Sequence, residues 1–558
     1  MYGSGAAFSD GKRLLFAANE ERFSRIKNDG GYPTRCIERG LAHIGGNWED
    51  ITHLAVCGIM TPPLPLRLLP DLQKRFRDSQ SQRSEGMFKQ FAEFVIEHTP
   101  VVHGQPGWWL SRLIRPIVPW AVRLHLPRQL AGMKVAVIEH HRAHAACAYH
   151  LSGFEDALIV TADGMGDGVS VSVSAGRRSK IDRLDYSSSR DSVGVFFERL
   201  TEGMGFIPNR DEGKLTGLAG SGDSTAVKVP SPFSVVDGKI RYSGLSGPAA
   251  THWVNREIVT QYRREDVAAW GQSILEQVIL GVTAYWLQAT GLKKIALAGG
   301  TFANVRLNQH LCELDGVEDI FIAPNMGDGG NSVGALCESG LLRPDGLPNV
   351  FLGTSYDDAR IEALLAGRDY SRPASLEAVA AAAIAEGKLV GRFSGRMEWG
   401  PRALGNRSIL ALPSRRAVVE RLNAKLKRSD FMPFAPAMLD EEAERFLVCP
   451  DRARHAAEFM TVCFNCREEM HQLFPAVVHV DGTARAQLVR ADSNPGFHAI
   501  LKELKALTGA GVVLNTSFNM HEEPIVESPE DALSAFDRAG LDALVLGPFW
   551  VERRDSDR

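Results

Sequence analysis

Short apolar runs followed by glycine-rich turns recur along the chain and predict buried β-strands. The clearest are KVAVIEHH, DALIVTADGMGDG, KKIALAGGTFAN, DIFIAPNMGDGG, KLVGRF and GVVLNTSFN. Because these runs are continuously apolar, the strands are expected in sheets that are buried on both faces. Helical stretches separate the strands, so the sequence predicts an α/β fold.

A stretch rich in proline and glycine, RPDGLPN at residues 343–349, is the best candidate for a linker. After it, Ser375 is expected to cap a helix through an alanine-rich run, and Gly387 to end that helix before a strand at 388–393. We place the domain boundary near residue 350, which divides the chain into residues 1–350 and 351–558. The chain has 558 residues, and a single core seldom serves more than roughly 250–300 residues, so more than one domain is expected.

Residues 66–130 have a different pattern, which is helical, basic and aromatic. They include Arg67, Lys74, Arg75, Arg77, Trp108, Trp109 and Trp120. Two interpretations stay open. The segment is either an amphipathic insertion with a solvated charged face or a lid over a substrate site.

Composition narrows the class of protein. The formal net charge is -4 and the sequence pI is about 6.5, so neither nucleic acid nor an anionic membrane is expected as the main partner. No apolar run approaches the ~18 residues that span a bilayer, and the N-terminus has no secretion-signal pattern. Eight scattered cysteines fit reduced thiols and predict a cytoplasmic protein. Cys463 and Cys466 lack a second ligand pair, which favours core packing over zinc.

The segment EHHRAH, which follows a predicted strand and opens a helix, is a candidate metal site. His140 and His144 are four residues apart, so they share one face of a helix and can bind one ion. A zinc protease needs glutamate directly after the first histidine, and His141 stands there instead. Two acidic residues extend the set, since Asp163 and Asp328 are each expected where a strand enters a glycine-rich turn.

Ligands gather at the carboxyl ends of strands in open α/β sheets. Two imidazoles and two carboxylates suit a borderline divalent ion such as Fe, Mn or Zn. The sequence therefore predicts a divalent metal site, on the assumption that the four side chains meet in the fold.

The glycines of the same region suggest nucleotide binding. GMGDG and AGGTFAN each follow a strand and offer backbone N–H groups to anionic oxygens. Two such turns resemble the actin-like and sugar-kinase ATPase fold, and the chain has no Walker A sequence, which excludes a P-loop. Between them, DEGKLTGLAGSG is either a ribose- and phosphate-binding segment or an exposed salt-bridged turn. The candidate nucleotide-binding residues are Gly164, Gly166, Glu212, Lys214, Gly299, Gly300 and Asn304.

The segment GRMEWGPRALGNRSI indicates an anion site after the boundary. The three arginines of this segment are interspersed with glycine, tryptophan and proline. A run of charged residues on a solvated surface does not normally have this pattern. Arginine matches phosphate or carboxyl oxygens in a bidentate way, lysine adds a point charge, and asparagine and serine can bind a small amide or carbonyl. The pattern predicts recognition of a small phosphate donor. The residues are Arg396, Arg402, Arg407, Lys427, Arg485, Asn515 and Ser517.

With these motifs in view, nearly the whole chain resembles the carbamoyltransferase family that includes nodulation, cephamycin and tobramycin carbamoyltransferases. The resemblance lies in EERFSRIK, EHHRAHAA, TADGMGDG, EGKLTGLAG, LAGGTFAN, GDGGNSVGAL, DGTARAQ and LNTSFN, and most specifically in GRMEWGPRALGNRSILA. It implies a first domain similar to tRNA threonylcarbamoyl transferase, on the actin-like ATPase fold. It implies a second domain similar to the synthase of threonylcarbamoyl adenylate.

The resemblance also implies residue roles. His140, His144, Asp163 and Asp328 would hold an iron-type ion, and Lys27 would contact carbamoyl adenylate. Glu212 and Lys214 would contact its nucleotide portion in the first domain. The carbamoyl phosphate site of the second domain would comprise Arg402, Lys427, Arg485, Asn515 and Ser517. The catalytic residues implied are Lys27, His140, His144 and Arg402.

One departure concerns the N-terminus. Family members begin with a strand that leads into a His-Asp pair before the small-residue run that matches residues 4–7 here. Tyr2 and Gly3 stand where that pair would fall. Two expectations stay open, a truncated start and a different acceptor site.

The sequence thus predicts an ATP-dependent O-carbamoyltransferase with Fe²⁺, ATP as co-substrate and Mg²⁺. It would make carbamoyl adenylate from carbamoyl phosphate and ATP, and carbamoylate a hydroxyl of a small secondary metabolite or sugar. No nucleic acid or membrane partner is expected. The alternatives are a sugar-kinase-like phosphotransferase, which would release ADP, and an ATP-dependent protein that modifies or binds tRNA.

Overall fold

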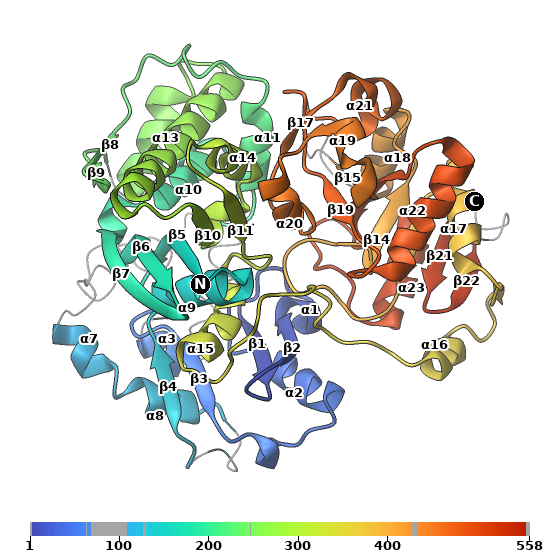
Figure 1. The fold of residues 1–558 in the computed structure, drawn as a ribbon, viewed down its shortest axis with the longest axis horizontal. Coiled ribbons are helices and arrows are strands. Elements are labelled where there is room, and N and C mark those ends of the chain that lie inside the picture. Colours follow the sequence, from blue (N-terminus) through green and yellow to red (C-terminus); the bar gives the residue numbers. More distant parts are fainter. Residues whose placement is uncertain are drawn as a thin grey trace. The chain divides into compact units, whose positions relative to one another are not determined.

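A computed structural model of the protein describes residues 3–62, 64–68, 109–126, 130, 132–245, 247–426 and 434–553 (Figure 1). The chain divides into two units. The first comprises Met1–Glu20 and Asn28–Leu347, and the second comprises Glu21–Lys27 and Pro348–Arg558. Most of the segment at 66–130 lies outside the described residues. Both interpretations of it, an amphipathic insertion and a lid, therefore stay predictions.

A five-stranded sheet forms the centre of the first unit, in the order β11-β10-β5-β6-β7. Strand β10 runs parallel to β5 and β11, whereas β5, β6 and β7 form an antiparallel meander. The apolar run at 157–160 of β5 is fully buried, as its composition predicts. The strands are β5 (Asp156–Gly166), β6 (Val169–Arg177), β7 (Lys180–Ser188), β10 (Lys294–Ala298) and β11 (Asp319–Ile322).

Two predicted strand ends were wrong. Strand β5 does not end at Asp163 but continues through Gly166, and β6 follows after two residues. Asp167 and Gly168 have φ of 51° and 84°, the left-handed pair that a tight two-residue hairpin requires. GMGDG is therefore a hairpin and not a turn from a strand into a helix. Asp328 likewise lies beyond the end of β11, in the short helix η6 (Asp328–Gly330).

Three smaller sheets complete the first unit: β1 (Gly5–Ser9) with β2 (Leu14–Asn19), β3 (Leu54–Cys57) with β4 (Val135–Ile138), and β8 (Phe233–Val236) with β9 (Lys239–Tyr242). Helix α15 packs against α9 and also against β1 and β3. The helices are α2 (Thr34–His43), α3 (Leu64–Leu68), α7 (Trp109–Ile114), α8 (Val118–Arg123), α9 (His140–Ser152), α10 (Val193–Gly203), α11 (Glu212–Ala219), α12 (Gly247–Trp253), α13 (Arg264–Thr290), α14 (Val305–Glu313) and α15 (Asn331–Glu338).

The second unit is built on an eight-stranded mixed sheet in the order β12-β22-β21-β13-β14-β20-β15-β19. Three further strands form a small sheet, β16 (Leu447–Val448), β17 (Phe464–Cys466) and β18 (Thr483–Ala484). The large sheet comprises β12 (Tyr370–Ser371), β13 (Val390–Phe393), β14 (Arg407–Ala411), β15 (Ala435–Leu439), β19 (Gln487–Val489), β20 (Val512–Ser517), β21 (Ala543–Leu546) and β22 (Phe549–Glu552).

Helices α17 and α22 pack together and share a core cluster with strands of this sheet. The Ser375 side chain accepts a hydrogen bond from the Ala378 N–H, and Gly387 has φ of 86°, so the predicted helix boundaries are confirmed. The helices are α1 (Glu21–Ser24), α16 (Asp358–Leu364), α17 (Leu376–Ala385), α18 (Ala417–Leu426), α19 (Ala443–Phe446), α20 (Arg454–Ala457), α21 (Glu468–Leu473), α22 (Pro495–Thr508) and α23 (Pro529–Ala539).

The segment Glu21–Lys27 groups with the second unit, although the boundary near residue 350 would leave it in the first. Its arginines explain the difference. The buried Arg22 donates to the carbonyl of Gly400 at 2.7 Å, and Arg25 donates to the carbonyls of Pro524 and Ile525 at 2.9 and 2.7 Å. Such contacts between residues far apart in sequence cannot be seen in a linear pattern.

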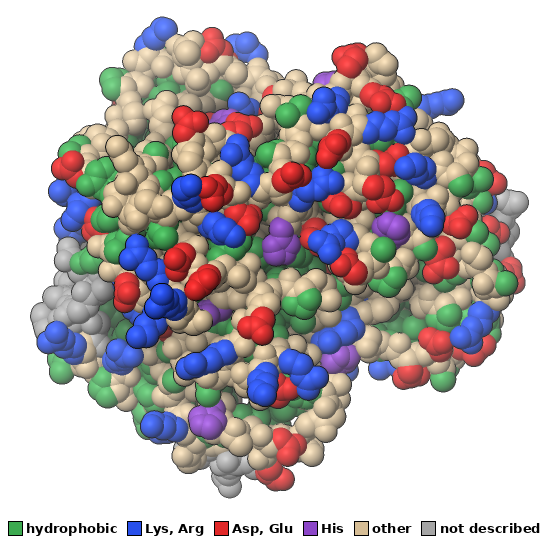
Figure 2. Space-filling model, viewed as in Figure 1, with side chains coloured by type: hydrophobic (Ala, Val, Ile, Leu, Met, Phe, Trp, Pro, Cys, Tyr) green, Lys and Arg blue, Asp and Glu red, His purple; other side chains and the backbone are tan. Residues whose placement is uncertain are grey.

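Charge is mixed on the surface that Figure 2 shows, where Lys and Arg side chains are interspersed with Asp and Glu side chains. This agrees with the small net charge. In the described part of the chain, no helix combines the length and the apolar character that a membrane span requires.

Candidate functional site

The start of helix α9 positions the histidine pair. Glu139 is the N-cap residue, and its carboxylate accepts hydrogen bonds from the N–H groups of His141 and Arg142, each at 3.0 Å. The helix therefore begins at His140, and His144 lies one turn further on the same face. The two Nε2 atoms are 3.1 Å apart. Both rings are buried, with 4% and 1% of their surface exposed.

The fold brings both predicted carboxylates to this pair. One oxygen of Asp163 lies 3.1 Å from Nε2 of His140 and 3.5 Å from Nε2 of His144. One oxygen of Asp328 lies 3.3 and 3.5 Å from the same atoms. All four side chains offer a ligand atom within 4.8 Å of one another. The four predicted side chains thus meet at one point, with contributions from α9, β5 and η6.

The donor spacing fits a transition-metal ion. An ion that binds nitrogen and oxygen at about 2.0–2.2 Å holds neighbouring donor atoms about 3.0–3.5 Å apart. The five distances above, from 3.1 to 3.5 Å, lie in that range. Two nitrogens and two oxygens also suit Fe, Mn or Zn chemically. We call His140, His144, Asp163 and Asp328 the four-ligand cluster.

Electrostatics tie the cluster together. Burial by itself would lower the pKa of His140, but the Asp328 and Asp163 carboxylates and the Cys57 thiol outweigh burial and raise that pKa well above its ordinary value. Burial would raise the pKa of Asp163, but both histidines outweigh it and hold that pKa well below its usual range. The site thus favours a positive charge between its carboxylates, which a bound cation would also supply.

The hairpin turn anchors this site through Asp167, a residue that the sequence analysis missed. Its buried carboxylate accepts from the backbone N–H groups of Ile59, Met60, Thr61 and His140 at 2.7–3.1 Å. The carboxylate thereby joins the end of β3, the start of α9 and the β5–β6 turn. The sequence feature that could have indicated this role is that TADGMGDG contains a second aspartate, Asp167, after Asp163.

His141 has a structural role. Its Nε2 lies 3.0 Å from the carbonyl of Val169, and its Nδ1 lies 2.7 Å from the Thr161 hydroxyl. Burial, then the neighbouring histidines, lower its pKa well below the ordinary value, so the ring is neutral. It therefore donates to the Val169 carbonyl and accepts from Thr161.

Replacing Gly166 by alanine is expected to weaken binding of a divalent ion by roughly 10- to 100-fold, the range for disturbing a group that orients a ligand. A Cβ there would lie 2.1 Å from Cδ2 of the His140 ring, so the ring must move. Metal analysis after equilibrium dialysis against Mn²⁺ checks this. Gly327→Ala is the matched control, because no atom lies within 4 Å of its added Cβ. Equal metal affinity of Gly166→Ala and the wild type would contradict the expected role.

The two glycine turns lie on either side of Asp163. The Ser192 hydroxyl donates to the carbonyl of Gly164 at 2.6 Å. A Cβ on Gly300 would lie 2.9 Å from an Asp163 oxygen, and one on Gly299 would lie 2.1 Å from the carbonyl of Ala162. Gly299 and Gly300 therefore need the absence of a side chain for close packing around β5, as Gly166 does against His140, whereas a Cβ on Gly164 would have room, 3.9 Å from Val195. Their role in nucleotide binding stays a prediction.

Glu212 and Lys214 lie on the first turn of α11, near Asn304. The Asn304 amide donates to Thr216 of α11 at 3.3 Å and to Gln272 at 2.8 Å, so the structure brings this part of both motifs together. Lys214 forms an ion pair with Asp211 at 3.0 Å. Glu212 accepts from the Asn209 N–H, and burial raises its pKa to about 7. As placed, both charged groups are engaged within the unit.

A cavity of about 1130 Å³ reaches the four-ligand cluster at His140 and Asp328. Its walls come from β1, α2, β3, α8 and α15, and most of them are apolar. Within the described residues, strands β1 and β3 each pair with one strand. The residues of both, Gly5–Ser9 and Leu54–Cys57, line the cavity. A ligand there would find apolar side chains and strand edges that have no strand partner among the described residues.

In the second unit, the arginine motif forms the connection from β13 to β14. Glu398 is buried, and one of its oxygens accepts from the N–H groups of Leu404, Asn406 and Arg407 at 2.8–3.1 Å. Arg407 lies over the Phe393 ring at 3.6 Å and donates to carbonyls of the connection. Arg396 donates to the carbonyls of Leu352 and Gly353. The guanidinium groups of Arg396 and Arg407 are thus engaged by backbone carbonyls.

Arg402 and Arg485 differ from these arginines. Both are partly buried, and among the described residues neither guanidinium donates to a backbone carbonyl or pairs with a carboxylate. Each also has a buried Nε without a partner in that part of the chain, a feature that Arg407 shares. Burial, then the charge of Arg485, lower the pKa of Arg402 to about 9. Two unpaired cations that disfavour each other in a desolvated site are stabilised by an anion. We call Arg402 and Arg485 the arginine pair.

Asn515 contacts residues close in sequence to the arginine pair. Its amide donates to the carbonyl of Ala403 at 3.2 Å and to Gln487 at 2.8 Å, and Gln487 donates to the carbonyl of Leu404 at 3.0 Å. The Asn515 oxygen is buried and has no hydrogen-bond partner in the described part of the chain. Ser517 lies two residues further along β20, and Lys427 lies outside the described residues. Gln487, in DGTARAQ, was missed although it joins these segments.

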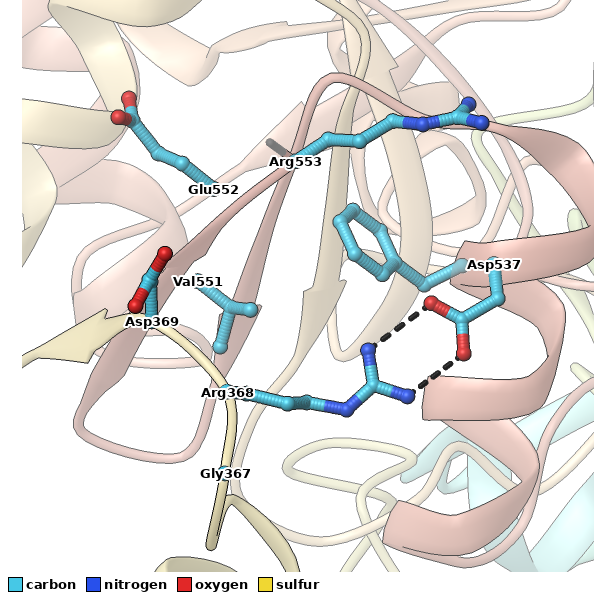
Figure 3. Close-up of a pocket in the computed structure, with 8 residues that line it drawn as sticks. Gly367, Arg368, Asp369, Asp537, Val551, Glu552 and Arg553 are labelled. Atoms are coloured by element: carbon cyan, nitrogen blue, oxygen red, sulfur yellow. Dashed lines mark hydrogen bonds and ion pairs between the residues drawn. The ribbon is translucent and has the colours of Figure 1, made fainter. Parts of the chain in front are cut away.

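A pocket of about 340 Å³ in the same unit offers a contrast. Figure 3 shows its Arg368 guanidinium facing both oxygens of Asp537, at 2.9 and 2.6 Å. That arginine is already neutralised, so the pocket has no comparable attraction for an anion. Cys463 and Cys466 are free thiols, with Cys463 buried as expected for core packing.

Lys27 is exposed and belongs to the segment that groups with the second unit. The other predicted nucleotide-binding residues lie in the first unit. The contact of Lys27 with carbamoyl adenylate stays a prediction.

Comparison with known proteins shows the family to which the chain belongs. Residues 1–337 match the family model described as Carbamoyltransferase N-terminus, and residues 381–553 match Carbamoyltransferase C-terminus. Nodulation protein NolNO of Sinorhizobium fredii is 31% identical over 99% of this chain and 79% of its own. The 3'-hydroxymethylcephem-O-carbamoyltransferase of Amycolatopsis lactamdurans is 31% identical over 46% of this chain and 48% of its own. A crystal structure of full-length HypF is 20% identical and covers 32% of this chain and 22% of its own, with a TM-score of 0.24, too low to support an argument.

The chain is therefore a group-transferring enzyme with a candidate metal centre in one unit and a candidate anion site in the other. It belongs to the carbamoyltransferase family.

Proposed function

We propose that the protein is an ATP-dependent O-carbamoyltransferase. The second unit makes carbamoyl adenylate from carbamoyl phosphate and ATP, and the first transfers the carbamoyl group to a hydroxyl of a small-molecule acceptor. The observation that carries the proposal is the arginine pair, two cations without a carboxylate partner in the described residues of a chain from this family.

The first half-reaction belongs to the arginine pair. Water releases phosphate from carbamoyl phosphate, and the resulting carbamate oxygen attacks the α-phosphorus of ATP and expels pyrophosphate. Arg402 and Arg485 would bind the phosphate by charge-assisted hydrogen bonds. The unpartnered Asn515 oxygen would accept a hydrogen bond from the carbamoyl NH₂ group. Lys427 and Ser517 complete the proposed set, and Mg²⁺ would accompany ATP.

The second half-reaction belongs to the four-ligand cluster, on a unit that we propose to be actin-like. The acceptor hydroxyl attacks the carbamoyl carbon and loses its proton, and AMP leaves. The four ligands would hold a divalent ion, Fe²⁺ by the family resemblance, whose chemistry is to polarise the donor and stabilise developing negative charge. Glu212, Lys214 and the glycine turns would bind the nucleotide portion. The cavity beside His140 and Asp328 would hold the acceptor.

ATP and carbamoyl phosphate are expected to yield AMP and pyrophosphate, because the proposed intermediate is an adenylate. Chromatography of the nucleotides, with pyrophosphate measured in parallel, checks this, and omission of carbamoyl phosphate is the control. Formation of ADP without AMP would reject the proposal in favour of a sugar-kinase-like phosphotransferase.

A further inference from the structure

The amide of Asn331 lies beside the four-ligand cluster. Its Nδ2 atom is 3.2 Å from Nε2 of His144 and 3.5 Å from Oδ1 of Asp328. The residue is buried, with 3% of its surface exposed. It begins α15, directly after η6, so Asp328 and Asn331 are three residues apart on one turn.

These two distances match the distances within the cluster. The ligand atoms of the four-ligand cluster are separated by 3.1–3.5 Å where they contact a histidine. The terminal amide atom of Asn331 is therefore at donor spacing from two members of the cluster, His144 and Asp328.

The amide's orientation follows from the chemistry of a loaded site. A metal-bound Nε2 of His144 has no lone pair left to accept from Asn331, and a cation repels an NH₂ group. A half-turn of the amide places Oδ1 there with almost no change in shape. The Oδ1 atom is buried and has no hydrogen-bond partner among the residues that the structure describes. The rotation would give that oxygen a partner.

We infer that Asn331 is a fifth ligand of the metal centre, binding a divalent ion through its side-chain oxygen. The inference rests on the proposed metal-binding role of the four-ligand cluster. An oxygen donor added to two imidazoles and two carboxylates favours five- or six-coordinate ions such as Fe²⁺ or Mn²⁺ over tetrahedral Zn²⁺.

Binding of Co²⁺ to the purified full-length protein tests the inference without turnover. Equilibrium dialysis gives the affinity, and the visible absorption of Co²⁺ reports the number of ligands. Asn331→Leu is expected to weaken Co²⁺ binding by about 10- to 100-fold and to intensify the visible bands as the coordination number falls. Asn331→Asp retains an oxygen donor and is expected to keep tight binding and a spectrum like that of the wild type.

Ser332→Ala is the matched control, because Ser332 is the next residue of α15, lines the same cavity and donates to the carbonyl of Gly329. Wild-type affinity and spectrum in a folded Asn331→Leu protein would overturn the inference. Equal weakening in Asn331→Leu and Asn331→Asp, with unchanged spectra, would also overturn it, since the NH₂ group would then be the part that matters. If the wild type binds no ion, or the His140→Ala/His144→Ala double variant still binds it, the four-ligand proposal fails first.

Discussion

Replacing His144 by alanine is expected to remove the bound ion and stop carbamoyl transfer while leaving adenylate formation intact. The imidazole is 1% exposed and lies within 3.1–3.5 Å of three other ligand atoms of the cluster. Loss of an outer-shell partner already weakens metal binding by about 10- to 100-fold, so loss of a ligand is expected to exceed ~100-fold. His140→Ala is expected to behave in the same way.

Metal analysis of the dialysed protein measures the first effect. Release of pyrophosphate from ATP and carbamoyl phosphate measures adenylate formation, and product formation from synthetic carbamoyl adenylate measures transfer. His150→Ala, on the same helix and outside the cluster, is the control and is expected to retain the ion. Retention of the ion when both His140 and His144 are replaced would refute the metal assignment.

Replacing Arg402 by lysine is expected to impair use of carbamoyl phosphate by roughly 10- to 150-fold, which corresponds to about 1.5–3 kcal/mol. A lysine cannot reproduce the two-pronged contact of a guanidinium. The site adds a second reason. Burial and the charge of Arg485 lower the pKa of Arg402 to about 9, and the same surroundings would remove the proton from a lysine more readily.

Pyrophosphate release at varied carbamoyl phosphate concentrations measures this loss. Arg368→Lys is the control, since that arginine pairs with Asp537 and is expected to leave the reaction unchanged. Transfer from synthetic carbamoyl adenylate is expected to stay nearly normal in Arg402→Lys. Mixing it with His144→Ala protein is expected to restore some turnover if the intermediate escapes. Failure of transfer in a folded Arg402→Lys protein would end the division of labour between the two units.

The expected results depend on features that were predicted from sequence to different degrees. Local features were predictable. The helix at EHHRAH places His140 and His144 on one face because four residues make about one turn, and Ser375 caps α17 through a hydrogen bond three residues away. The apolar runs formed strands β4, β5, β10, β11, β13 and β20. Such interactions join residues that are close in sequence, so they can be predicted from the order of residue types along the chain.

Strand ends were less predictable, because a hairpin and a strand-to-helix turn use the same glycines. GMGDG became a hairpin only because β6 returns beside β5. Tertiary structure alone decided the long-range partnerships. Glu21–Lys27 joins the second unit through Arg22 and Arg25, although its sequence lies between β2 and α2 of the first.

The residue types of both candidate sites could be named from sequence, but their convergence could not. Asp163 and Asp328 meet the histidines because β5 and η6 pack beside α9, and Asn331 joins them because α15 begins where η6 ends. Arg396 and Arg407 donate to backbone carbonyls, whereas Arg402 and Arg485 have no such partner among the described residues. By itself, the sequence determined the strands, the helix caps and the spacing of the histidines, which act over a few residues. The tertiary structure decided which distant donors share a site and which arginines stay unpaired, because both depend on packing between segments far apart in the chain.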